Sequence, residues 1–173
     1  MSVNEELEEH THEAKEPFDK RVAATMAIIA AALAVVSVAG HILTTDELLG
    51  QQRASDQWAF YQAKSIRRYT AETTVDLLAT VKSDEAVAGK YKEDAKKYRE
   101  QSDEIQKEAR ALEAESHIRG KQALHAHFGE VFLEIAIVFS PLAILTKRNV
   151  FYLAGVVSAL IGAVAAATAL FVT

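Results

Sequence analysis

The sequence predicts an all-α integral membrane protein, with three transmembrane helices and a long antiparallel coiled-coil hairpin between the first and the second. Three observations predict this fold class. Three stretches of the chain are apolar and almost free of charge. The region between the first two stretches is dense in Lys, Arg, Asp and Glu. That region also lacks proline and is rich in residues of high helix propensity.

The composition excludes several classes of protein. The 173 residues carry a net charge of −5, with 19 basic side chains that form no stripe interleaved with aromatic residues. Such a chain is not expected to bind nucleic acid. The absence of cysteine removes disulfides, thiolate metal sites and thiol nucleophiles.

The first predicted element is an acidic tail at residues 1–21, and the second is a transmembrane helix at 22–43. This stretch has no formal charge, and its length meets the ~20 residues that a helix needs to cross a bilayer. Its apolar run exceeds the ~7–15 residues of a signal-peptide core, and a Glu-rich tail precedes it. We therefore expect an uncleaved span.

Residues 44–127 are expected to form the extramembrane hairpin, with its turn near 83–89. Apolar and small side chains recur in alternating steps of four and three, as in a coiled coil. In the second arm this seam comprises Tyr91, Ala95, Tyr98, Ser102, Ile105, Ala109, Leu112 and Ser116. A weaker seam in the first arm comprises Ala59, Ala63, Ile66, Thr70, Thr73, Leu77 and Thr80. Equal arms of ~40 residues would return the chain to the membrane.

Thr44-x-x-Glu47 resembles a capping box, which marks a place where the first helix could break or re-cap as it leaves the lipid. The remaining spans are predicted at 128–146 and 150–172. The first of these is short and carries Glu130 and Glu134 near its start, so two spans with a half-buried middle segment are the alternative.

Orientation follows from the basic residues beside the spans. Lys20 and Arg21 adjoin the first span, and Lys147 and Arg148 lie between the second and third, so both clusters fall on one side of the membrane. That side is expected to be cytoplasmic. The prediction is a multi-pass inner-membrane (plasma-membrane) protein with a cytoplasmic N-terminus and a periplasmic (extracytoplasmic) hairpin.

Two motifs carry a resemblance to a known family. The first is Ala54-Ser55-Asp56-Gln57-Trp58-Ala59-Phe60-Tyr61-Gln62-Ala63-Lys64 followed by Ile66-Arg67, and the second is Gly129-Glu130-Val131-Phe132-Leu133-Glu134-Ile135-Ala136. Together with the layout of the whole chain, they resemble the bacterial membrane family catalogued as "domain of unknown function 4337". The resemblance implies the architecture and no activity.

His41, Glu130 and Glu134 are the candidate intramembrane polar residues. A spacing of four places both carboxylates on one helix face, which should turn toward protein or water because a lipid-exposed carboxylate is costly. We hypothesise that His41 and one of the glutamates form a hydrogen-bonded pair that joins two spans. The alternatives are a purely structural role and an ion or proton site.

A second candidate site is an aromatic and polar patch in the first arm. Its members are Asp56, Trp58, Tyr61, Gln62, Lys64 and Arg67. Trp, Tyr and Arg dominate interface energetics, so the patch could dock a partner or a neighbouring subunit. The alternative, which is compatible with the first, is that Trp58 and Tyr61 pack against the returning arm.

Small residues in the first and third spans predict close helix packing, since lipid offers no hydrophobic driving force and small faces let backbones approach. The candidates are Ala27, Ala34, Gly155, Ala159, Gly162 and Ala163.

No nucleophile or phosphate-binding motif stands out, and His125, His127, His10 and His12 make only a weak case for a metal site. We therefore expect no enzyme, no metal and no cofactor. The first hypothesis is a non-enzymatic membrane scaffold or interaction protein that contacts lipid, self-associates as a homo-oligomer and binds an unidentified envelope protein. The alternative is a small oligomeric ion or proton channel, or a transporter subunit, that uses Glu130 and Glu134.

Overall fold

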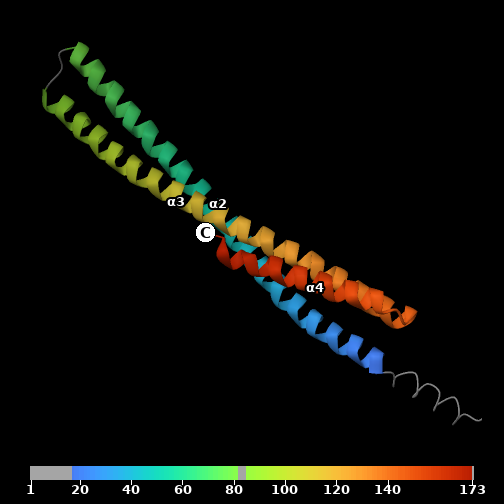
Figure 1. The fold of residues 1–173 in the computed structure, drawn as a ribbon. Helices are drawn as coiled ribbons and strands as arrows, with labels where there is room; N and C mark the ends of the chain where they lie inside the picture. The colour runs from blue at the N-terminus through green and yellow to red at the C-terminus, as the bar shows by residue number, and fades with distance from the viewer. Residues whose placement is uncertain (1–16, 82–84, 173) are drawn as a thin grey trace, which may run out of the picture. The chain divides into compact units, whose positions relative to one another are not determined.

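The computed structural model describes residues 17–81 and 85–172, and nearly all of them are helical. The elements are α2 (Pro17–Thr80), α3 (Glu85–Thr146), α4 (Asn149–Thr168) and a short 3-10 helix, η1 (Ala169–Phe171) (Figure 1). No strand occurs in these two ranges, so the prediction of an all-α fold is confirmed. The acidic tail up to residue 16, with its two histidines, lies outside the described residues, as do Ser83 and Asp84 of the expected turn.

Helix α2 continues through Thr44, where the sequence contains a capping-box pattern that could have ended it. Residues on both sides of Thr44 belong to α2, and the Thr44 hydroxyl donates a 3.0 Å hydrogen bond to the Gly40 carbonyl one turn earlier. This is the bond that a threonine makes inside a helix, whereas a capping threonine accepts from the backbone ahead of it.

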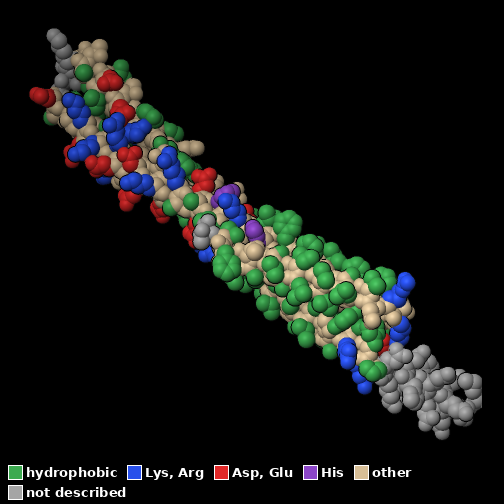
Figure 2. Space-filling view, viewed as in Figure 1, with side chains coloured by type: hydrophobic (Ala, Val, Ile, Leu, Met, Phe, Trp, Pro, Cys, Tyr) green, Lys and Arg blue, Asp and Glu red, His purple; other side chains and the backbone are tan. Residues whose placement is uncertain are grey.

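The described residues form two compact units. The charged unit is Thr45–Arg119, and the apolar unit comprises residues 17–44 and 120–172. In Figure 2, Lys, Arg, Asp and Glu side chains gather over the charged unit, whereas hydrophobic side chains cover the apolar unit. The two surfaces therefore have opposite chemistry.

The apolar unit is organised around Ile29 of α2 and Leu133 and Ala136 of α3. Leu33 and Val36 of α2, Ile137 of α3 and Ala159 of α4 pack against this core, so all three helices contribute. Between α3 and α4, Lys147 adopts a left-handed conformation with φ 52°, and its ammonium group lies 2.7 Å from the Asp19 carboxylate.

In the charged unit, α2 and α3 are antiparallel. Contacts that advance along α2 retreat along α3: Ser116 bonds to the Glu47 carbonyl, Lys64 bonds to Gln101, and Arg99 pairs with Glu72. The seam predicted for the second arm faces α2, because Ala95, Ser102, Ile105, Ala109 and Ser116 are buried.

The seam predicted for the first arm is on the wrong face. Ile66 is 65% exposed and Leu77 is 62% exposed, and Ala59, Ala63, Thr70, Thr73 and Thr80 are exposed as well. Helix α2 contacts α3 instead through a face that includes Ala54, Ser65 and Ala71. Periodicity identified the uncharged stripe of α2, but the face that α3 covers carries Arg68 and Glu72, so the absence of charge did not mark the buried side.

Three helices are long and apolar enough to cross a membrane, judged by length and composition. They are α2, α3 and the segment Asn149–Phe171.

Candidate functional site

A polar cluster in the apolar unit centres on His127 of α3. Its Nδ1 lies 3.0 Å from the Glu130 Oε2 atom, and its Nε2 lies 3.1 Å from the Thr44 Oγ1 atom. Because Thr44 belongs to α2, the imidazole ring connects the two helices. The His127 side chain is 40% exposed and the Glu130 side chain 18%, so the pair lies at the edge of the packed interior.

The hydrogen-bond roles in this cluster follow from its chemistry. An ionised Glu130 carboxylate only accepts, so the His127 Nδ1 atom carries the proton. Thr44 donates to the Gly40 carbonyl while its oxygen can accept from a doubly protonated His127. With a neutral ring, the Thr44 hydroxyl must instead turn and donate to Nε2. Thr44 can therefore satisfy either charge state of the ring.

Ser37, Gly40 and His41 complete the cluster from α2. The Ser37 side chain lies near the Glu130 carboxylate. A methyl group on Gly40 would lie 3.2 Å from the His127 Cε1 atom, so this glycine makes room for the ring. The His41 and His127 rings are 6.2 Å apart and nearly perpendicular.

The prediction paired His41 with a glutamate, and the structure adds His127 to this site. The His127 imidazole bonds to Glu130, and the His41 ring lies beside the His127 ring. Sequence reasoning grouped His127 with His125 as weak metal ligands. The i,i+3 spacing of His127 and Glu130 was the signal that could have found the pair. His125 instead bonds to Thr168 at 2.8 Å, and no group of three metal-ligating side chains occurs in the described ranges.

Glu134 has a different environment from Glu130, although they lie one turn apart. It is exposed, and it forms no hydrogen bond or ion pair with any other described residue. Of these two glutamates, Glu130 is the one that joins a hydrogen-bonded cluster within the described chain.

The second candidate site lies in the charged unit, where an open groove of about 740 Å³ runs between α2 and α3. It is lined by Glu47, Ser55 and Trp58 from α2 and by Arg110, Glu113 and His117 from α3, among others. The Trp58 and Tyr61 rings make an edge-to-face contact, with their centroids 5.6 Å apart.

The predicted patch divides between two faces of α2. Lys64 turns toward α3, where it donates a 2.9 Å hydrogen bond to Gln101 and lies 5.6 Å from the centre of the Tyr98 ring. Trp58 and Tyr61 are half-buried. Asp56, Gln62 and Arg67 are exposed, and Asp56 accepts a hydrogen bond from Gln52. The structure thus does not bring all six residues into one site.

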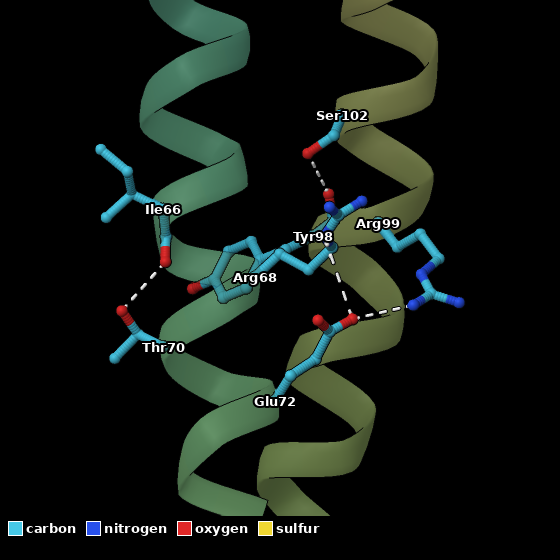
Figure 3. A network of polar contacts seen from close by, with 7 residues as sticks. All are labelled: Ile66, Arg68, Thr70, Glu72, Tyr98, Arg99 and Ser102. Carbon is cyan, nitrogen blue, oxygen red and sulfur yellow. Dashed lines mark hydrogen bonds and ion pairs between the residues drawn. The ribbon is translucent and has the colours of Figure 1, made fainter.

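A network of ionic contacts lies farther along this unit (Figure 3). Glu72 of α2 accepts a 2.9 Å hydrogen bond from Arg99 of α3, and the Arg68 Nε atom lies 3.9 Å from the same carboxylate.

The small residues predicted to pack helices are buried in some cases and exposed in others. Gly155 and Gly162 are buried against α3, and Ala159 is half-buried. Ala163, Ala27 and Ala34 are exposed, so none of them is buried against another helix of the described chain. The packing face of α2 includes larger residues such as Ile29, which lies in one cluster with Leu133 and Ala136 of α3.

Comparison with known proteins gives a single result. No curated protein and no solved structure matches the chain. One family model, described as "Domain of unknown function (DUF4337)", matches residues 18–172. Because that match covers nearly the whole chain, the protein belongs to this family of uncharacterised domains.

Proposed function

We propose that this protein is a non-enzymatic integral membrane scaffold of a bacterial inner membrane, which crosses the bilayer three times, presents the charged unit as a coiled helical hairpin and self-associates. The observation that carries this proposal is the contrast between the two units. Large apolar side chains are exposed on all three helices of the apolar unit, including Ile28 at 71%, Val138 at 61% and Leu160 at 63%. Water does not tolerate so continuous an apolar surface, whereas lipid does.

The charged unit supports an interaction role. Its fully buried side chains are small, with Ser102 and Ala109 at 0% exposure, so the two helices approach closely and bury little apolar area of their own. An isolated two-helix unit of this kind gains little stability from its core, which favours packing against other proteins or other copies.

The His127 cluster supports a structural role over a catalytic one. A hydroxyl, an imidazole and a carboxylate in this order also form the triads of hydrolases. Here the hydroxyl belongs to Thr44 inside α2 and donates to the Gly40 carbonyl. The neighbouring backbone N–H groups are engaged in the helix, so they do not form an oxyanion hole beside this hydroxyl. The cluster is suited to holding α2 against α3.

Membrane extraction and topology mapping test the proposal. The protein should stay in the membrane pellet at alkaline pH. A reporter at Ala88 should read as extracytoplasmic, and reporters at Lys147 and at the C-terminus should read on opposite sides of the bilayer. Release into the supernatant would overturn the proposal, as would a cytoplasmic Ala88. Cation or proton flux through the purified protein in liposomes, abolished by E134Q, would favour the channel instead.

A further inference from the structure

In one stretch of α2, two charged residues, Arg68 and Glu72, are turned toward α3 while the apolar Ile66 is turned toward solvent, the reverse of what a free-standing hairpin in water should do. The Arg68 side chain is 15% exposed and the Glu72 side chain 33%, whereas Ile66 is 65% exposed. Figure 3 shows Ile66 and Thr70 on the side of α2 away from α3. A face of α2 with apolar character is therefore left uncovered within the charged unit.

This face is an ordered stripe. Its members follow one another in steps of four and three along α2, and none of them is charged: Ala59, Ala63, Ile66, Thr70, Thr73, Leu77 and Thr80. All of them are exposed. The charged side chains of this segment, such as Lys64, Arg67 and Asp76, fall outside the stripe. Steps of four and three are the spacing of a seam between two supercoiled helices.

We propose that this stripe is the surface through which α2 pairs with α2 of a second copy of the chain, in parallel and in register. The inference rests on the proposed function, because two copies with the same topology in one membrane must carry their α2 helices in the same direction. Each member of the stripe then meets its own counterpart.

The stripe is suited to meeting itself. Each of its layers is uncharged, so no layer sets like charges against each other in a symmetric pair. In the register of a parallel two-stranded coil, Arg67 at one edge lies opposite Gln62 of the partner, and Asp76 lies opposite Val81, so neither edge pairs like charges.

The apolar unit provides a second observation. There too, α2 leaves small residues exposed, including Ala27 and Ala34 at a spacing of seven. Small faces allow close helix approach in lipid. The same helix thus presents a self-compatible face in each unit, which favours a second α2 over an unrelated partner.

Single cysteines test the pairing directly, because the natural chain has none. Ile66→Cys places a thiol on the stripe, and Glu100→Cys places one on the exposed face of α3 as a matched control. Under mild oxidation in native membranes, Ile66→Cys should give about tenfold or more disulfide dimer than the control, since a disulfide needs Cα atoms within ~7 Å.

The second measurement uses charge. Ile66→Lys combined with Leu77→Lys should weaken self-association by about tenfold or more, because each lysine would be buried against its counterpart. Both side chains are exposed in the single chain, so its helicity and its membrane residence should be unchanged. Ala111→Lys, at an exposed position of α3, is the control and should leave association intact.

Each outcome has a distinct meaning. A multimer that cross-links at Glu100→Cys and not at Ile66→Cys overturns this inference and leaves the proposed scaffold standing. A different protein trapped by Ile66→Cys also overturns it. A monomer that remains in the membrane overturns both this inference and self-association, whereas loss of membrane residence refutes the proposed function itself.

Discussion

Gly129 of α3 and Gly162 of α4 face each other so closely that a methyl group on either would lie 2.7 Å from the carbonyl oxygen of the other. Real side chains do not occupy such space, so the contact between α3 and α4 depends on both residues being glycine. Ser158 strengthens the same contact with a 2.7 Å hydrogen bond to the Phe132 carbonyl.

The first prediction concerns this contact. Gly162→Ala should destabilise the protein by about 1–3 kcal/mol, because backbone atoms of α3 would have to move. Gly89→Ala is the matched control, since nothing lies within 4 Å of a methyl group there. It should stabilise α3 by about 0.5–1 kcal/mol through helix propensity. Unfolding in detergent, followed by circular dichroism, measures both, and equal effects would contradict the packing argument.

The second prediction concerns Thr44 and His127. Thr44→Val and His127→Phe in a double-mutant cycle should show a coupling of about 0.5–1.5 kcal/mol, as found for hydrogen bonds between membrane helices. Thr25→Val is the control, because Thr25 contacts Tyr152 instead, and its coupling to His127 should be near zero. A coupling no larger than that of the control would remove the proposed joining role of the cluster.

The third prediction separates the two carboxylates. Glu130→Leu should lower the free energy of unfolding in detergent by about 1–3 kcal/mol, because it leaves the His127 Nδ1 atom without its acceptor. Glu134→Leu should change it by less than about 0.5 kcal/mol, as expected for an exposed side chain with no partner in the described chain. The reverse order of effects would show that the wrong glutamate has been assigned to the cluster.

The fourth prediction compares two residues of the charged unit. Arg99→Ala should lower the free energy of unfolding by less than about 1 kcal/mol, because the Arg99 side chain is 62% exposed. In high salt, which screens the ion pair, even this difference should disappear. Ala109→Leu should cost about 1–3 kcal/mol, since Ala109 is fully buried between the helices. Urea melts at two salt concentrations provide the test, and a larger loss at Arg99 would mean that ion pairs dominate the unit.

The sequence correctly predicted the all-α class and the face of α3 that packs against α2. The α3 seam was identifiable because large and small uncharged residues alternate within a strongly charged helix, and Ser102, Ala109 and Ser116 are indeed buried. The α2 seam was predicted on the uncharged stripe, which the structure leaves exposed, whereas the face that α3 covers carries Arg68 and Glu72. Spacing alone could not choose between them, and only the position of α3 decides.

The polar cluster was predicted in part. Glu130 and His41 were singled out because charged and titratable residues in apolar stretches need partners. The partner His127 was missed because it was counted as the last residue of the expected hairpin and its bond to Thr44 joins residues 83 positions apart. No local pattern encodes such a contact.

The two residues between α3 and α4 also bear on the order of folding. Lys147 takes a left-handed conformation and Phe151 already bonds back to the Arg148 carbonyl, so the chain reverses direction within a few residues. Closing so short a loop costs little chain entropy, whereas α2 meets α3 in the apolar unit only across a much longer stretch of chain. We therefore expect α3 and α4 to pair first and α2 to join them afterwards, which makes the most C-terminal helix an early participant in assembly.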